Sequence, residues 1–302
     1  MKHDQASRTA RLVSNGLYWV SQHARLGVEV PEEMLRYTTE MTRRIESGGR
    51  FLGTSIARWL LLRKCGIVQA LSIPGLYLHQ VLRKRYIESV ARTALAGDTK
   101  QLVVIGAGFD TLSLRLSVAL PECRMIEIDH PATQKAKTAA LGEFELLTGS
   151  CHFLPADLST ESLASALARC PAYDSHSATL FIAEGLTMYL DEANIRALLE
   201  GVLSQAAGSE LVFTYMDESS PGRFDFQNAR IVTSWWLALC GERFTWGVRE
   251  AELPAFLEGS GFRLREHRTP EQMRVAMLTE ANRNAVIALG ENTAWATPVS
   301  LG

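Results

Sequence analysis

The stretch from Gln101 to Gln134 constrains the fold more than any other part of the chain. It reads QLVVIGAGFDTLSLRLSVALPECRMIEIDHPATQ: an apolar run, a glycine turn, a helical segment and a second apolar run. The turn Gly106-Ala107-Gly108 permits a sharp bend and a close approach of a ligand to the backbone. The second run ends in Asp129, about 20 residues later, where nucleotide-binding folds place a carboxylate for ribose hydroxyls. We therefore expect a ribose-containing ligand at this end of a buried sheet.

Strands and helices alternate after this stretch, which is typical of a parallel sheet with helices on both faces. We predict strands at Leu102 to Ile105, Arg124 to Ile128, Cys151 to Leu154, Thr179 to Ala183, Glu210 to Tyr215, Phe262 to His267 and Ala285 to Leu289. We predict helices at Thr111 to Ala119, Pro131 to Leu141, Ser159 to Ala168, Asp191 to Ala207, Ala251 to Gly259 and Pro270 to Glu280. The expected fold class is α/β, with a Rossmann-like, mostly parallel seven-stranded sheet.

Residues 1–96 carry helix signals almost throughout, and no linker rich in Ser, Gly or Pro separates them from the sheet. Helices are expected at Arg8 to Leu26, Pro31 to Ile45, Phe51 to Cys65 and Gly75 to Ala96. We expect a helical N-terminal cap at 1–96, packed on a core at 97–302. Within the core, an insertion at about 217–247 is rich in Phe and Trp and is placed to act as a lid; the alternative is that its aromatic residues only pack it onto the sheet.

Several function classes find no support in the composition. A net charge of −2 over 302 residues offers no basic surface for nucleic acid or for an anionic membrane. The five cysteines are scattered without C-x-x-C spacing, so they predict neither a zinc site nor a disulfide framework. We find no triad of carboxylates or histidines for another metal, and expect none.

Targeting signals are also missing from the sequence. The N-terminus MKHDQASRTA lacks the apolar core of a signal peptide, and no window is long and apolar enough to predict a membrane span. In the segment Ile56 to Leu82 charges interrupt the apolar face, which favours buried cap helices over a membrane-surface helix. We expect a cytoplasmic protein with no stable membrane association, and the sequence leaves its oligomeric state open.

The glycine turn departs from the dinucleotide fingerprint G-x-G-x-x-G, because Thr111 stands at the third glycine position. This weakens the interpretation as an NAD(P)-dependent oxidoreductase, which remains an alternative. A ligand with adenine and ribose but no phosphate fits the turn better, and S-adenosylmethionine is such a ligand.

Further carboxylates follow the predicted strands. Asp110, Asp157 and Glu184 join Asp129 at or just beyond strand ends, where open α/β sheets bind their ligands. The alternative for Asp110 and Asp157 is helix capping, since each lies near a predicted helix start. Their convergence at one edge is therefore a hypothesis about a site.

Four linked motifs between Arg83 and Leu190 resemble the leucine carboxyl methyltransferase family. They are GAGFDTLSLRL, EIDHPATQ, the pair Asp157-Leu158, and EGLTMYL from Glu184, in this order and spacing. The family includes protein phosphatase methyltransferases and many bacterial enzymes, among them polyketide carboxyl O-methyltransferases. The resemblance implies a class I methyltransferase fold with S-adenosylmethionine as cofactor.

The resemblance also implies roles for single residues. Gly106 would lie under the methionine part of the cofactor, Asp129 would hold the ribose, Asp157 and Leu158 would bracket the adenine, and Glu184 would lie near the methionine ammonium. The family uses an arginine upstream of the glycine turn for the cofactor carboxylate. Arg85 in RKRYIES is our candidate, with Arg83 and Arg92 as alternatives.

The expected activity is transfer of a methyl group to a small-molecule carboxylate, giving a methyl ester. A carboxylate acceptor needs alignment and desolvation rather than a general base. Tyr189, which follows Glu184 closely, is the candidate for contact with the acceptor or the methyl group, and a packing role is the alternative. Hydroxyl O-methylation, methylation of a protein C-terminus, and a non-catalytic protein that binds the cofactor remain open.

Overall fold

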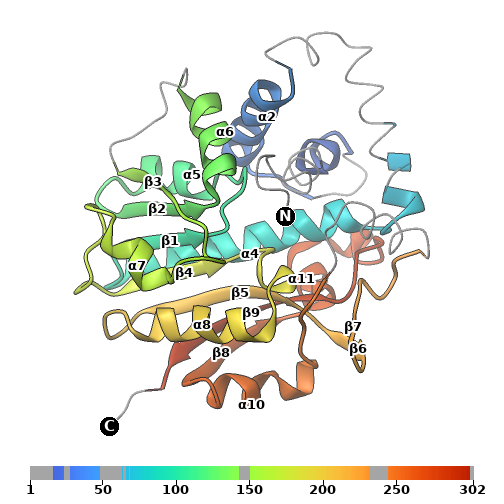
Figure 1. Ribbon diagram of the computed structural model, residues 1–302. Coiled ribbons are helices and arrows are strands. Elements are labelled where there is room, and N and C mark those ends of the chain that lie inside the picture. The colour runs from blue at the N-terminus through green and yellow to red at the C-terminus, as the bar shows by residue number, and fades with distance from the viewer. Residues whose placement is uncertain are drawn as a thin grey trace.

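A seven-stranded sheet forms the centre of this computed structural model, which describes residues 16–23, 28–47, 63, 66–67, 69–142, 150–230 and 244–299. Its strands are β1 (Gln101–Ile105), β2 (Arg124–Asp129), β3 (Cys151–Pro155), β4 (Thr179–Ala183), β5 (Glu210–Met216), β8 (Phe262–Arg268) and β9 (Glu291–Pro298). Their spatial order is β3-β2-β1-β4-β5-β9-β8 (Figure 1). The first five strands run parallel, and β9 lies antiparallel between β5 and β8. The mostly parallel seven-stranded sheet predicted from the sequence is confirmed.

Helices cover both faces of the sheet because successive strand residues point to opposite sides. On one face, Leu102 and Val104 of β1 pack with α2 (Glu32–Ser47), α4 (Leu76–Ala96), α5 (Leu112–Ala119), α6 (Pro131–Leu141) and α11 (Pro270–Met277). On the other face, Val103 and Ile105 pack with α7 (Leu163–Ala168), α8 (Glu192–Leu203) and α10 (Leu253–Glu258). Short 3-10 turns complete the described elements: η2 (Thr187–Tyr189), η3 (Glu250–Glu252) and η4 (Glu280–Asn282).

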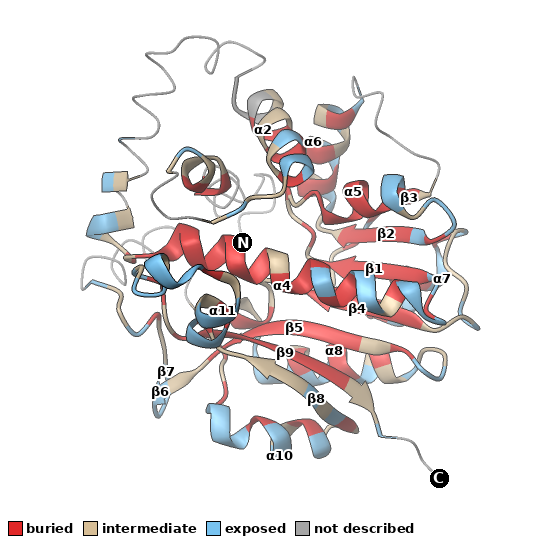
Figure 2. Cartoon of the chain, turned by 180° about the vertical axis from the view of Figure 1, so that it is seen from behind, coloured by how far each residue is buried: buried red, intermediate tan, exposed pale blue. Residues whose placement is uncertain are grey.

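The helix α4 is buried along most of its length, and Figure 2 shows most of it in the buried colour, with exposed positions near its C-terminal end. Its buried residues include four ionisable side chains as well as apolar ones: His79, Arg83, Lys84 and Glu88. A buried charge is costly unless it is paired and hydrogen-bonded. We therefore expect charged or polar partners from other elements to contact α4 at these four side chains.

The strand predicted at Ala285 to Leu289 is wrong, and the last strand of the sheet begins at Glu291 instead. The backbone N–H of Gln227 donates to the carbonyl of Leu289 at 2.8 Å, so this apolar run binds the insertion rather than the sheet. Gly290 then turns the chain with a φ of +110°. β9 escaped prediction because its sequence, ENTAWATP, has only one large apolar side chain, Trp295, and does not look like a central strand.

The N-terminal part packs directly on the sheet domain where it is described. Tyr37 and Met41 of α2 belong to the same apolar core as β1, and α2 packs against α5 and α6. Residues 16–21 are helical, whereas most of the helices expected at Arg8 to Leu26 and Phe51 to Cys65 lie outside the described residues. The division into a cap at 1–96 and a core at 97–302 stays a prediction.

Within the insertion, the structure describes residues 217–230 and 244–247. Two of its aromatic residues, Trp235 and Trp236, lie outside the described residues. It begins with a two-stranded hairpin of β6 (Glu218–Ser220) and β7 (Arg223–Phe224). Across the described ranges, none of the helices is long and apolar enough to cross a membrane. The same ranges contain no cluster of three His, Cys, Asp or Glu side chains that could hold a metal ion.

Candidate functional site

The glycine turn and Asp129 form one hydrogen-bonded unit at the carboxyl edge of the sheet. Gly106 and Gly108 have φ angles of +69° and +50°, which favour glycine. This bend lets the N–H of Gly108 donate to Asp129 Oδ2 at 2.5 Å, while the N–H of His130 donates to Oδ1 at 2.6 Å. The end of β2 thus presents a carboxylate in a fixed orientation next to the turn that follows β1.

Burial raises the pKa of Asp129, and it outweighs the opposing hydrogen bonds from Gly108 and His130. A carboxylate that has lost water gains from new hydrogen-bond donors. Two hydroxyls of a ribose are donors of this kind. The geometry therefore suits the role expected for Asp129.

Gly106 also brings the turn against the loop that follows β4. A Cβ atom built at Gly106 would lie 3.1 Å from a methyl carbon of Leu186, closer than ordinary packing allows. Its N–H donates to the carbonyl of Ile128 at 2.8 Å, which ties the turn to β2. A side chain at position 106 would push apart the two loops that border the site.

Glu184, just beyond β4, accepts from two cations on α4. Arg83 donates from Nε and Nη2 to Glu184 Oε1 at 3.0 and 2.7 Å. Lys84 Nζ lies 3.0 Å from the same oxygen and 3.0 Å from Asp110 Oδ1. Burial would raise the pKa of Asp110, yet Lys84 and its neighbours hold it well below its usual range. Asp110 therefore belongs to this group of ion pairs and does not cap α5. The N-cap residue of α5 is Thr111, which makes no side-chain cap hydrogen bond.

Two further residues of this group were not predicted from the sequence. Arg83 Nη1 pairs with both carboxylate oxygens of Glu291, the first residue of β9. His79 Nε2 lies 2.8 Å from Glu291 Oε2. Burial would raise the pKa of Glu291, but Arg83 and His79 lower it to about 2. Glu291 was missed because 208 residues separate it from Arg83 and because β9 itself was not predicted.

The structure brings Arg83, rather than Arg85, to Glu184. Successive residues of an α-helix point about 100° apart, so Arg85 lies on another side of α4. No hydrogen bond or ion pair between described residues joins Arg85 to Glu184. Arg92, the other alternative, pairs with Glu88 four residues earlier on the same helix.

Asp157 and Leu158 follow β3 on the other side of Asp129. Asp157 Oδ1 accepts from the N–H and the hydroxyl of Ser159 at 3.0 and 2.6 Å, and Oδ2 lies 3.9 Å from His130 Nε2. Leu158 is half-buried against the core. Ser162, not Asp157, caps α7 with its hydroxyl. The pair thus lies beside the residue that follows Asp129, where an adenine would extend from the ribose.

Tyr189 belongs to a row of aromatic side chains that joins the site to the insertion. Its ring packs edge to face on Phe244, with 5.6 Å between the ring centroids. The centroids of Phe244 and Phe226 are 5.9 Å apart, and those of Phe226 and His79 are 6.2 Å apart. Met188 and Met216 fill the same apolar cluster. Met188, Tyr189, Phe226 and Phe244, which we call the apolar wall, pack the insertion against the loop after β4. These contacts support packing as at least one role of Tyr189.

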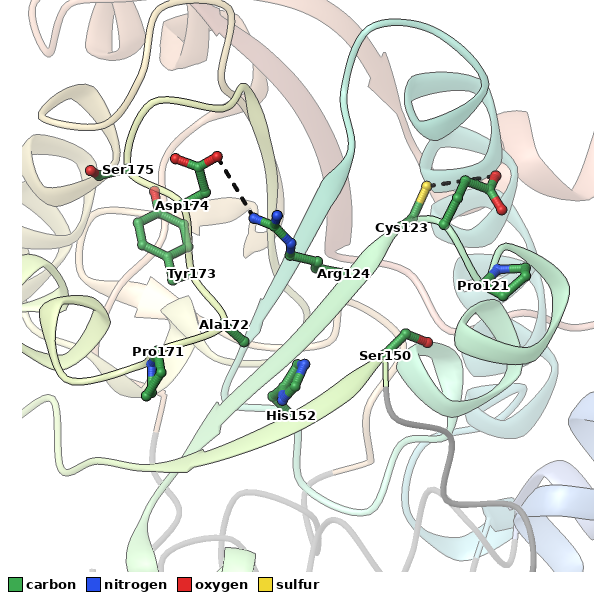
Figure 3. Close-up of a pocket in the computed structure, with 11 residues that line it drawn as sticks. Pro121, Cys123, Arg124, Ser150, His152, Pro171, Ala172, Tyr173, Asp174 and Ser175 are labelled. Carbon is green, nitrogen blue, oxygen red and sulfur yellow. Dashed lines mark hydrogen bonds and ion pairs between the residues drawn. The ribbon is translucent and has the colours of Figure 1, made fainter.

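An open depression of about 940 Å³ lies at the opposite edge of the sheet (Figure 3). It is bordered by residues that precede β2 and β3 and by the loop at 171–175. Arg124 and Asp174 face each other across it at 3.7 Å (Figure 3). None of the predicted site residues lines it, so this hollow is separate from the candidate site.

Comparison with known proteins agrees with this geometry. The family model for leucine carboxyl methyltransferase matches residues 60–203. The Bacillus subtilis protein YktD, provisionally named an S-adenosyl-L-methionine-dependent methyltransferase, is 29% identical over 196 residues, which cover 63% of this chain and 63% of YktD. A Streptomyces coelicolor protein with the same provisional name is 32% identical over 137 residues, 44% of this chain and 47% of its own. The chain therefore spans less than two thirds of the length of these relatives.

Two solved structures share the fold at low sequence identity. A methyltransferase from Thermobifida fusca, so named provisionally, superposes with a TM-score of 0.55 at 15% identity, covering 86% of this chain and 94% of that one. A DUF574 family protein from Streptomyces avermitilis superposes with a TM-score of 0.59 at 15% identity, covering 91% and 100%. These two structures confirm the fold predicted from the sequence. Over residues 60–203, slightly less than half of the chain, the sequence is similar to the leucine carboxyl methyltransferase family, and the names of its relatives agree with S-adenosylmethionine as the expected cofactor.

Proposed function

We propose that this protein is a cytoplasmic S-adenosylmethionine-dependent O-methyltransferase that converts a carboxylate of a small molecule into a methyl ester. The observation that carries the proposal is the pairing of Arg83 and Lys84 with Glu184 and Asp110, within reach of the loop that also positions Asp129. A nucleoside with an amino-acid end needs a ribose acceptor and a charge-paired subsite together. This edge of the sheet offers both.

Different residues of the chain bind different parts of the cofactor. Asp129 accepts from the ribose hydroxyls, and Asp157 with Leu158 borders the adenine beside His130. Glu184 pairs with the ammonium group of the methionine end. Arg83 takes the carboxylate contact for which Arg85 was the first candidate, because Arg83 is the arginine that reaches Glu184. Gly106 leaves the room that the methionine part requires against Leu186.

When bound, S-adenosylmethionine supplies an electrophilic methyl group on a sulfonium. The protein then has to hold the acceptor in line and to exclude water from its nucleophilic oxygen. The apolar wall of Met188, Tyr189, Phe226 and Phe244 suits this task, since its packed side chains can exclude water from an apolar acceptor. A carboxylate acceptor is already ionised at neutral pH and needs no base.

The direct test is product analysis. The protein is incubated with methyl-labelled S-adenosylmethionine and a panel of apolar small-molecule carboxylic acids, each paired with its alcohol or phenol analogue. We expect label only in the acids, in a product that mild base hydrolyses back to the acid. A base-stable labelled ether would identify a hydroxyl O-methyltransferase instead.

Three outcomes distinguish the remaining alternatives. Labelling of a protein C-terminus, when the protein and labelled cofactor are incubated with a cell extract, would indicate a protein carboxyl methyltransferase. Tight binding of NADH with no binding of S-adenosylhomocysteine would support the oxidoreductase alternative. Cofactor binding without label transfer to any acceptor would support a non-catalytic binding protein.

A further inference from the structure

Arg83 is shared between two buried carboxylates from different parts of the fold. Its Nη1 atom faces Glu291 at the start of β9, whereas Nε and Nη2 face Glu184 after β4. The side chains of Arg83, Glu184 and Glu291 are 7%, 9% and 2% exposed, so water contributes little to any of them. The guanidinium is therefore oriented by protein groups on two sides.

We propose that Glu291 is a positioning residue that holds Arg83 for the amino-acid end of S-adenosylmethionine. The inference rests on the proposed function and adds a residue to it. The Nε–Nη2 edge of a guanidinium can bind a carboxylate through two parallel hydrogen bonds. Glu291 engages Nη1, so the Nε–Nη2 edge, which donates to Glu184 in this structure, is the edge available to a ligand carboxylate.

The charges of the ligand explain why a second carboxylate is needed. The methionine end carries one ammonium and one carboxylate. As the ammonium pairs with Glu184, this glutamate gives up part of its interaction with Arg83, and the ligand carboxylate takes its place. Glu291 remains on Nη1 throughout, so the guanidinium keeps its orientation while its other partner changes. His79 holds Glu291 in turn through Oε2.

Simple stabilisation of the fold accounts less well for this arrangement. Two buried carboxylates around one arginine cost more desolvation than a well-packed apolar group of the same volume would. The same helix contains a comparison: Glu88 pairs with buried Arg115 and with Arg92, away from Glu184. If buried ion pairs on α4 served stability alone, Glu88 and Glu291 would respond alike to neutralisation.

The experiment compares two ligands by calorimetry in the full-length protein. S-adenosylhomocysteine has the amino-acid end, whereas 5′-methylthioadenosine has the same adenine, ribose and thioether without it. We expect Glu291→Gln to weaken S-adenosylhomocysteine binding roughly 30-fold, the cost of unpairing a buried charge contact. Binding of 5′-methylthioadenosine should change by less than about twofold, because that ligand makes no contact with Arg83.

Glu88→Gln is the matched control, since it also neutralises a buried glutamate of an arginine pair. It should leave the ratio of the two affinities unchanged. Glu291→Asp keeps the charge on a shorter side chain and should recover part of the lost selectivity, and it serves as the second variant if Glu291→Gln does not fold.

Equal weakening of both ligands in Glu291→Gln, or unchanged S-adenosylhomocysteine binding, would overturn the positioning role while leaving the proposed function intact. If the wild-type protein binds neither ligand, the proposed function itself fails. The two failures are therefore distinguishable in one data set.

Discussion

The two edges of the central sheet present charged residues in opposite ways. At the carboxyl edge, Arg83 lies buried between Glu184 and Glu291. At the amino edge, Arg124 and Asp174 are 50% and 37% exposed, 3.7 Å apart, beside an open depression of about 940 Å³. An exposed pair of this kind contributes little to stability or binding, whereas buried charges persist only with defined partners. The candidate site is therefore marked by paired buried charges.

Topology explains why the charged group lies at the carboxyl edge. The loops after β1, β2, β3 and β4 all emerge there, and they supply Asp110, Asp129, Asp157 and Glu184 in turn. The amino edge receives the loops that enter the strands, and these need only connect helices to the sheet. Substitutions at the carboxyl edge are therefore expected to have larger effects than matched substitutions at the amino edge or on neighbouring surfaces.

Acid is expected to weaken the ion pair of Glu291 with Arg83. Its folded pKa of about 2 lies below the ordinary 4.5, so the pair stabilises the fold fully above pH 4.5 and loses this contribution as pH falls towards 2. At pH 6 the free energy of unfolding should be larger for the wild type than for Glu291→Gln. This difference between the two proteins should become about 2 kcal/mol smaller when the pH is lowered to 3. Urea unfolding at both pH values measures it. For Asp174→Asn, the difference in free energy of unfolding from the wild type should change much less between these pH values. An equal change would contradict the proposed difference between the two edges.

Asp129→Ala should weaken S-adenosylhomocysteine binding about 100-fold, because it removes the acceptor for two ribose hydroxyls and leaves the N–H of Gly108 without its carboxylate. Calorimetry gives the dissociation constant. Asp174→Ala, at the amino edge, should stay within about twofold of the wild type. Unchanged binding in Asp129→Ala would remove Asp129 from the ribose site.

Arg83→Lys should raise the dissociation constant of S-adenosylhomocysteine roughly 30-fold, since lysine cannot form the paired hydrogen bonds of a guanidinium. Arg85→Lys on the same helix should change it by less than about twofold. The comparison decides between the two arginines of RKRYIES. A larger effect from Arg85 than from Arg83 would restore the first assignment.

The smallest effect is expected at the apolar wall. Tyr189→Ala removes a ring that packs on Phe244, and it should raise the KM for the acceptor about tenfold without changing the affinity for S-adenosylhomocysteine. Tyr189→Phe keeps the ring and should lie within about threefold of the wild type. A severe loss of kcat in Tyr189→Phe would instead indicate that the hydroxyl contacts the reacting groups.

The sequence predicted the first five strands and the position of Asp129 because these features depend on local signals. An apolar run bounded by glycine or proline marks a buried strand, and the distance from Gly108 to Asp129 is set by one helix and one strand. The strand predicted at Phe262 to His267 also corresponds to β8, whereas β9 and its Glu291 could not be predicted in this way. β9 is buried by its two neighbours despite its polar composition, so only the tertiary fold reveals it.

The choice among the arginines shows the same limit at the scale of one helix turn. Arg83 and Arg85 share a motif and differ by about 200° in direction around α4. Which of them faces Glu184 depends on how α4 is rotated against the sheet. This rotation is fixed by packing of residues such as Leu78 and Leu82, which the motif does not contain.

The pairing of Arg83 with Glu291 also has a consequence for how the protein is made. Synthesis proceeds from the N-terminus, so a nascent chain that has completed α8 contains the whole segment matched by the family and still lacks one of the two carboxylates of Arg83. The charged group around Arg83 is complete only when β9 takes its place between β5 and β8. A ribosome-bound chain stopped before β9 would therefore lack the carboxylate partner of Arg83 Nη1, and assembly of this group would coincide with completion of the sheet.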